Sequence, residues 1–237
     1  MTEIRRYKDK DKVLVAVDCI IFGFDPNEEE LKLLVIKRHF QPEKGNWSLI
    51  GGFLFEEETL ASAANRVLHK LTGLHDVYMQ QLSAFSELDR DPGARTISVV
   101  YYSLVNVQDI REDIQNEYSA TWFKISERPE LIFDHNIMIH MAISQLRHKA
   151  SIEPIGFELL PEKFTMRQLQ KLYEEIYCEE LDKRNFSKKM SSLNVLERLD
   201  EKDMQSSKKG SFLYMFDPYK YRNQKNNGFL IKQSVSI

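Results

Sequence analysis

Hydrophobic and polar residues change their spacing along the chain, and this spacing predicts two segments of different character. In the first segment, runs rich in β-branched residues predict buried strands over 13–22, 31–38, 45–52, 96–107 and 120–125. Apolar residues at helical spacing predict two amphipathic helices, over 59–72 and 136–149. Gly73 follows the first of these at the place of a C-cap glycine. Mixed strands with few helices predict an α+β or α/β sandwich.

The second segment begins after residues 153–156 and has a different order of elements. Helical spacing covers 166–177 and 183–193, and short apolar runs near 195–199 and 212–216 predict two strands. The polar run Asp200–Ser211 connects these strands. Two helices followed by a long-tipped hairpin are typical of a winged helix-turn-helix. We therefore expect two domains, residues 1–150 and residues 151–237.

Composition limits the classes of protein that the chain can belong to. Its 237 residues, 42% hydrophobic and 29% charged, indicate a globular chain of one ordinary and one small domain. No apolar run approaches the roughly 18 residues of a membrane span, and no signal peptide is evident. Cys19 and Cys178 have no metal-ligand spacing, so we expect two buried thiols in a cytoplasmic protein. The net charge of -3 is compatible with one basic, DNA-binding face.

The stretch from Gly52 to Leu74 resembles the Nudix box. The matching positions are Gly52, Glu58, Arg66, Leu68, Gly73 and Leu74. Nudix hydrolases bind Mg²⁺ through carboxylates one, four and five positions after the arginine, on one face of the helix. This chain has Val67, Lys70 and Leu71 there. The resemblance therefore implies a Nudix fold without hydrolysis, bound metal or cofactor. The alternative is a hydrolase of a nucleoside diphosphate derivative with displaced metal ligands.

A domain without catalytic carboxylates keeps a cleft that can bind a ligand. Asp18 lies in an apolar strand and is costly to bury, so either backbone groups satisfy it or it binds something polar. Phe40 and Trp47 offer aromatic surface but fit the core equally well, and Glu58 fits an ion pair with Arg66. The predicted effector-binding residues are Asp18, Lys37, Phe40, Trp47, Glu58, Asp89 and Arg90.

The second segment carries a basic helix. Thr165 and Gln168 fit a capping box at the start of one helix, and Asp182 fits the N-cap of the next. That next helix has one apolar stripe and basic or amide residues opposite it, which suit base edges and phosphates in the DNA major groove. The alternatives are a solvated basic face and a domain that binds protein. The predicted DNA contacts are Arg167, Gln168, Lys183, Arg184, Asn185, Lys188, Lys189, Lys208 and Lys209.

Taken whole, the chain resembles the Nudix-related transcriptional regulators. The resemblance rests on 133–135, 155–165, 169–174 and 181–186. It implies a Nudix-type α/β/α sandwich with a mixed sheet, followed by a C-terminal winged helix-turn-helix. It also implies a homodimer on double-stranded operator DNA, controlled by a small effector.

Two branches of that family differ in the effector. One responds to ADP-ribose and controls NAD metabolism, and the other, of the AraR type in Bacteroides-type bacteria, responds to L-arabinose. The runs 17–24, 89–93 and 150–154 are similar to the second branch. They imply L-arabinose or a related sugar as the effector, and the ADP-ribose-responsive regulator is the alternative.

Overall fold

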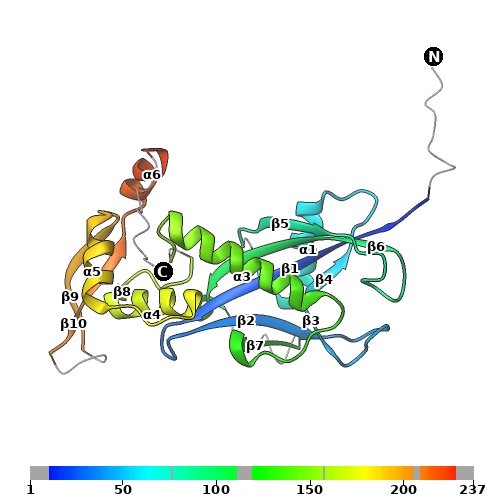
Figure 1. Cartoon of the computed structure of the whole chain (residues 1–237), viewed down its shortest axis with the longest axis horizontal. Coiled ribbons are helices and arrows are strands. Elements are labelled where there is room, and N and C mark those ends of the chain that lie inside the picture. The colour runs from blue at the N-terminus through cyan, green and yellow to red at the C-terminus, as the bar shows by residue number, and fades with distance from the viewer. Residues whose placement is uncertain (1–10, 76, 111–118, 157, 205–208, 228–237) are drawn as a thin grey trace, which may run out of the picture.

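The computed structural model describes residues 11–75, 77–110, 119–156, 158–204 and 209–227 (Figure 1). Two parts follow one another along the long axis, a mixed sheet with helices and a smaller winged helix. The elements of the first part are β1 (Leu14–Asp25), β2 (Glu30–Lys37), β3 (Trp47–Ser48), β4 (Ile50–Phe53), α1 (Leu60–Thr72), β5 (Gln80–Phe85), β6 (Thr96–Asn106), β7 (Ala120–Lys124) and α3 (His135–Ile152). The elements of the second part are β8 (Phe164–Thr165), α4 (Met166–Tyr177), α5 (Lys183–Ser192), β9 (Leu196–Asp203), β10 (Ser211–Phe216) and α6 (Pro218–Asn227).

β1 is the centre of the seven-stranded sheet. It pairs in parallel with β6 and antiparallel with β2 and β4, and β7 joins the sheet through β2. Side chains of a strand alternate between the two faces. Ile20 and Phe22 of β1 accordingly belong to the core on the α3 side, whereas Cys19 and Ile21 belong to the core on the α1 side. This α/β/α arrangement confirms the predicted fold class.

The helix of the Nudix-like segment begins and ends where the sequence predicts. Thr59 caps the N-terminus of α1 through a reciprocal capping box with Ser62. Gly73 ends the helix in the left-handed conformation, with φ 70°, and its N–H bonds the carbonyl oxygen of His69. Arg66 forms an ion pair with Glu58, in which Nη2 lies 2.8 Å from Oε2. This pair joins the preceding loop to α1.

The winged helix is also confirmed. Thr165 and Gln168 form the predicted capping box of α4, and the side chain of Asp182 accepts from the N–H of Asn185 at the start of α5. β8, β10 and β9 form its three-stranded sheet. β9 extends to Asp203, so part of the polar run predicted as a connection continues the strand. The residues of β9 beyond Leu199 are all charged, which leaves no apolar alternation from which to predict a strand.

The two parts share one hydrophobic core. Phe24, Leu33 and Leu146 of the first part belong to the same buried cluster as Leu169 and Ile176 of α4. The hairpin between β1 and β2 extends to α4, where Glu29 pairs with Arg167 (Nε to Oε1, 2.9 Å) (Figure 1). The backbone N–H of Leu31 also donates to Glu175 Oε2 at 3.3 Å. Strands of the first domain therefore contact a helix of the second directly.

Some details differ from the sequence-based expectations. Cys19 is buried as expected, but Cys178 is exposed, because it is the left-handed C-cap of α4 (φ 54°) rather than part of its apolar stripe. β5, β8 and α6 were not predicted. No helix in the described part of the chain is long and apolar enough to cross a membrane.

Candidate functional site

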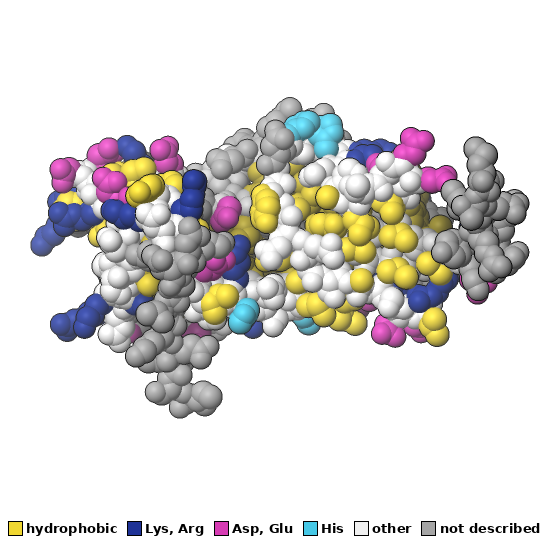
Figure 2. Space-filling view, turned by 90° about the horizontal axis from the view of Figure 1, so that it is seen from above, with side chains coloured by type: hydrophobic (Ala, Val, Ile, Leu, Met, Phe, Trp, Pro, Cys, Tyr) yellow, Lys and Arg dark blue, Asp and Glu magenta, His cyan; other side chains and the backbone are white. Residues whose placement is uncertain are grey.

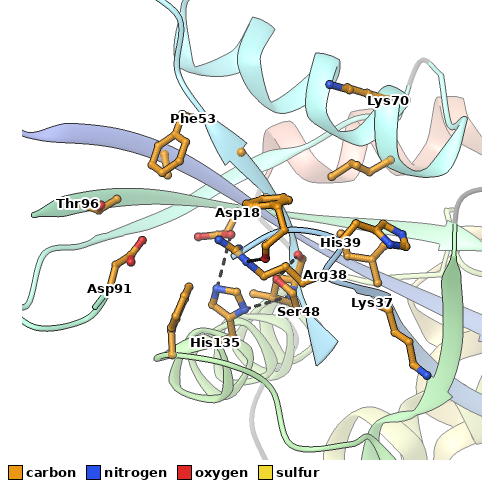
Figure 3. A pocket seen from close by; sticks show the side chains of 18 of the residues that line it. Asp18, Lys37, Arg38, His39, Ser48, Phe53, Lys70, Asp91, Thr96 and His135 are labelled. Carbon is orange, nitrogen blue, oxygen red and sulfur yellow. Dashed lines mark hydrogen bonds and ion pairs between the residues drawn. The ribbon is translucent and has the colours of Figure 1, made fainter. Parts of the chain in front are cut away.

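A pocket of about 290 Å³ lies between α1 and the start of α3, at one end of β1 and β4 (Figure 3). Its floor comes from β1 and β4, one wall from α1, and the rest from the segments after β2 and before α3. The lining comprises Ala16, Asp18, Ile36, Lys37, Arg38, His39, Phe40, Ser48, Leu49, Gly51, Gly52, Phe53, Lys70, Leu71, Arg90, Asp91, Thr96, Phe133 and His135.

Buried charges form the inner end of the pocket. Asp18 and Arg90 are 6% and 7% exposed. Ser98 donates to Asp18 Oδ2 at 2.5 Å, and Arg90 Nη2 lies 3.8 Å from the same oxygen. Arg90 also binds Asp134 through two parallel hydrogen bonds, of 2.9 Å from Nε and 2.8 Å from Nη2. Asp18 is thus satisfied by side chains, which removes most of the cost of burying it.

Gly51 makes room for this carboxylate. A Cβ atom at residue 51 would lie 2.1 Å from Asp18 Oδ1, far inside van der Waals contact. The glycine of the Nudix-like loop is therefore required at this position by the aspartate on the neighbouring strand, with which it is paired in the sheet.

His135, the first residue of α3, completes the cluster. The backbone N–H of Leu49 donates to its Nδ1 at 3.1 Å, so the neutral ring carries its proton on Nε2, which lies 3.8 Å from Asp18 Oδ1. Burial lowers the pKa of His135 below its usual value, an effect that the charge of Asp18 opposes. The neutral imidazole is the form that this site stabilises.

The lowered pKa of His135 predicts a loss of stability in mild acid. Below pH 6.5 the unfolded chain binds this proton more readily than the folded chain does. The stability contributed by the neutral ring is therefore complete above pH 6.5 and is lost as the pH falls toward the folded-state pKa. Urea unfolding at pH 7.5 and 5.5 measures the effect, and we expect His135→Asn to reduce the difference. His148→Asn, on the exposed face of α3, is the control; equal pH dependence of the two variants would contradict the prediction.

The outer part of the pocket is aromatic and cationic. The guanidinium of Arg38 lies 4.1 Å from the ring centroid of Phe40 and 5.5 Å from that of Phe133, and its Nε donates to the carbonyl oxygen of Phe40 at 3.3 Å. Lys70 projects from α1, and in Figure 3 it lies on the other side of Asp18 from His135. Such a surface suits a ligand with flat and anionic parts.

The structure brings some of the predicted effector-binding residues together and separates others. Asp18, Lys37, Phe40 and Arg90 line the pocket. The amino group of Lys37 points away from it (Figure 3) and lies 5.1 Å from the ring centroid of Trp47.

The other three predicted residues lie outside the lining. Trp47 packs edge-on against Phe123, with ring centroids 5.0 Å apart, in the shared core. Glu58 is held by Arg66, and Asp89 lies in an exposed turn. Effector contacts by these residues stay predictions.

Several pocket residues were not predicted as ligand contacts. They are His39, Lys70, Phe133 and His135, whereas Arg38 and Asp91 were candidates to line the cleft. One signal was present in the sequence: a buried Asp18 requires partners, and His135 at the start of an amphipathic helix is one of them, beside Arg90 and Ser98. The sequence could not predict that β1 and the start of α3 lie side by side.

The winged helix presents most of its predicted DNA contacts to solvent. Phe186 and Met190 bury one stripe of α5, and the opposite face is exposed. Arg184 and Lys188 lie on that face, Asn185 lies beside it, and Lys183 and Lys189 flank the buried stripe. All five are exposed. None of these cations forms an ion pair with a residue that the structure describes. Lys and Arg side chains project from this end of the molecule in Figure 2, with acidic residues between some of them.

The remaining predicted DNA contacts differ in their surroundings. Arg167 is paired with Glu29, and the Gln168 side chain caps α4 and donates to the carbonyl oxygen of Pro26 at 3.4 Å. Lys209 is exposed at the tip of the wing. Lys208 lies outside the described residues.

Family models match both parts of the chain. The NUDIX domain matches residues 12–140, and the NrtR DNA-binding winged helix domain matches residues 156–216. The ADPR responsive transcriptional repressor NtrR of Acinetobacter baylyi is 30% identical over 212 residues, which cover 88% of this chain and 84% of that relative. The chain belongs to the NrtR family. A Nudix domain followed by this winged helix is therefore its established organisation.

Solved structures of NrtR proteins share the fold. Shewanella oneidensis NrtR in complex with a 27mer DNA is 25% identical, with a TM-score of 0.77, and the match covers 88% of this chain and 95% of that one. The Nudix domain of the same protein in complex with ADP ribose is 26% identical, with a TM-score of 0.51, over 59% of this chain and 92% of that one.

The family comparison also includes an enzyme. The ADP-ribose pyrophosphatase of Methanocaldococcus jannaschii is 33% identical over 137 residues, 58% of this chain and 77% of that relative. Relatives of this NrtR-family chain therefore include both a regulator and a hydrolase.

The expectation of L-arabinose or a related sugar as effector is wrong. The relative from Acinetobacter baylyi is described as ADPR responsive, and the Nudix domain of Shewanella oneidensis NrtR was solved in complex with ADP ribose. The prediction of L-arabinose as effector rested on three short runs of sequence, 17–24, 89–93 and 150–154. Only a few of their side chains, Asp18, Arg90 and Asp91, line the pocket. The run 89–93 is largely a surface turn, and 150–154 is the end of α3 and its exit. Likeness in such segments carries little information about the ligand.

Proposed function

We propose that this chain is a transcriptional repressor whose binding to operator DNA is controlled by ADP-ribose in the Nudix-domain pocket. The observation that carries the proposal is the union, in one NrtR-family chain, of a cationic and aromatic pocket with a winged helix whose α5 presents a basic face. The relative from Acinetobacter baylyi, matched over 84% of its length, is an ADPR-responsive repressor. In this proposal residues 1–150 bind the effector and residues 151–237 bind DNA.

α5 is the element that we propose reads the operator, and Lys209 of the wing contacts phosphate. Exposed Arg and Asn side chains suit guanine and adenine edges, and Lys suits the backbone. Arg167 and Gln168 act from α4, where their contacts with Glu29 and Pro26 set the position of this helix against the first domain. We further propose a homodimer, as the resemblance to the family implies. The hydrophobic area on one face of the Nudix domain in Figure 2 is suited to such an interface.

The effector signal has a short path to the winged helix. Asp18 of β1 and Lys37 at the end of β2 line the pocket. The opposite ends of the same two strands form the hairpin that holds Arg167 through Glu29. A ligand that shifts β1 against β2 would therefore move α4 and, with it, α5.

Hydrolysis is the second candidate function, because of the likeness to the ADP-ribose pyrophosphatase. Two-metal phosphoryl chemistry needs carboxylates that hold the ions, and Val67, Lys70 and Leu71 provide none. We therefore expect no AMP from ADP-ribose with Mg²⁺ or Mn²⁺ above an enzyme-free blank, while a thermal-shift titration with ADP-ribose raises the melting temperature. AMP release would favour the enzyme. An unchanged melting temperature over a wide range of ADP-ribose concentration would contradict the proposed effector.

A further inference from the structure

α1 carries a lysine at one of the positions whose carboxylates hold metal in a Nudix hydrolase. Of the three positions that carry metal-binding carboxylates in such enzymes, Lys70 and Leu71 line the pocket, and Val67 is buried beneath Gly52. Within the described ranges, no group of three or more His, Cys, Asp and Glu residues is arranged to hold a metal ion. The residues present on this helix therefore do not fit a divalent metal ion.

The charged residues of the pocket favour an anion. Arg38, Lys70 and Arg90 line the pocket beside two carboxylates, Asp18 and Asp91, and the amino group of Lys37 points away from it. The inner charges largely compensate one another, since Arg90 is bound to Asp134 and lies 3.8 Å from Asp18. The outer part of the pocket carries Arg38 and Lys70. Asp91, Asp18 and Glu43 act electrostatically on Arg38, whereas Lys70 has no ion-pair partner among the described residues.

Lys70 is free to take a ligand. It is exposed, and no acidic residue in the described part of the chain forms an ion pair with it. Arg38 is held by its stacking on Phe40 and Phe133, and its Nε is engaged with a backbone carbonyl. Its two terminal nitrogens make no hydrogen bond to a described residue, so they are also available to an anion.

We propose that Lys70 replaces the metal ions of a Nudix hydrolase. Its ammonium group binds the diphosphate of the nucleotide ligand directly, with Arg38 as the second cation, and no divalent metal takes part. This inference rests on the proposed function. Lysine is a compact point charge that suits phosphate oxygens, as metal ions do. Unlike bound metal ions, it generates no hydroxide for attack on the diphosphate. The same residue therefore preserves affinity for the ligand and prevents its consumption, as a sensor requires.

The test is calorimetric titration of the full chain with ADP-ribose, once in EDTA and once in Mg²⁺. The variants are Lys70→Gln, which removes the charge, and Lys70→Glu, which restores one carboxylate. Lys44→Gln changes an exposed lysine outside the pocket lining and is the matched control. Adenosine, which has no diphosphate, is the control ligand.

We expect wild type and Lys44→Gln to bind ADP-ribose with the same Kd in both buffers. Lys70→Gln should raise the Kd for ADP-ribose by about tenfold or more. In EDTA, Lys70→Glu should raise this Kd further than Lys70→Gln does. Binding of adenosine should be the same in all variants. If ADP-ribose bound only in Mg²⁺, or if Lys70→Gln left the Kd for ADP-ribose unchanged, the role of Lys70 would be overturned. ADP-ribose would still be the effector. Absence of ADP-ribose binding to wild type in both buffers would overturn the proposed effector, and the role of Lys70 with it.

Discussion

Replacing Arg90 with methionine is expected to lower the free energy of unfolding by about 3–5 kcal/mol, because it leaves buried carboxylates uncompensated. The arginine side chain is 4% exposed and lies between two acids, bound to Asp134 at 2.8 Å and 3.8 Å from Asp18. Methionine fills similar space without charge. The remaining partner of Asp18 among the described side chains at hydrogen-bond distance is Ser98.

Urea unfolding at pH 7.5 measures this loss. Arg95→Met is the matched control, because Arg95 lies in the same segment but donates to the carbonyl oxygens of Glu87 and Thr96 rather than to a carboxylate. Arg95→Met is expected to lower the free energy of unfolding by about 1 kcal/mol. Adding Asp134→Asn to Arg90→Met should recover part of the stability, since it removes one uncompensated charge. If Arg90→Met lowered the free energy of unfolding by no more than Arg95→Met does, the description of a buried, coupled charge cluster would be contradicted.

Replacing Arg184 with alanine is expected to weaken operator binding about ten- to a hundredfold, because a bidentate contact to a base carries about 1–3 kcal/mol. Arg184 is exposed on α5, opposite the buried Phe186 and Met190. Its removal should leave folding and ADP-ribose binding unchanged, since the pocket lies in the other domain. The operator is obtained by selection from a random DNA library with the purified chain.

Lys209→Ala separates base reading from phosphate contact. A lost phosphate contact weakens operator and random DNA alike and lowers the salt dependence of binding by about one unit of slope. Arg184→Ala should instead reduce the ratio of operator to random-DNA affinity. If Arg184→Ala left operator affinity unchanged, α5 would not be the reading helix, and its charge would be a solvated basic face.

The sequence predicted the elements of this fold well where local patterns decide them. Apolar spacing and capping residues located α1, α4 and α5 to within a residue or two, because Thr59, Thr165 and Asp182 cap the helices through contacts within one turn. β9 was predicted too short, because its last four residues, 200–203, are all charged and show no apolar alternation. β5 was missed, and its register irregularity next to Ser83 interrupts the alternation that a strand prediction uses.

The candidate site was predictable only in part. Asp18 stood out as a carboxylate in an apolar strand, and Arg90 was predicted with it. The cluster itself depends on long-range contacts: Asp18 meets Ser98 and His135, residues far along the chain that the sheet and α3 bring together. Arg167 has a partner that the sequence did not indicate. Glu29 of a distant hairpin forms an ion pair with it, and its contact with DNA stays a prediction.

Ligand identity was the least predictable property. The fold determines where the pocket lies, whereas the choice of ligand depends on individual side chains of the lining, which carry no sequence pattern of their own. Of the three runs that favoured a sugar, one lies in the buried strand β1, one in a turn and one at the end of a helix. Their likeness to one branch of the family therefore said little about the pocket.

The most direct test is the operator affinity of the full chain as ADP-ribose is added, measured by fluorescence anisotropy of labelled operator DNA in EDTA. We expect saturating ADP-ribose to raise the Kd for operator by about tenfold or more, a coupling free energy of at least about 1.4 kcal/mol. Adenosine and ribose at the same concentrations should have no such effect. An operator Kd that saturating ADP-ribose leaves unchanged, for a chain that binds ADP-ribose by calorimetry, would contradict control of DNA binding by the pocket.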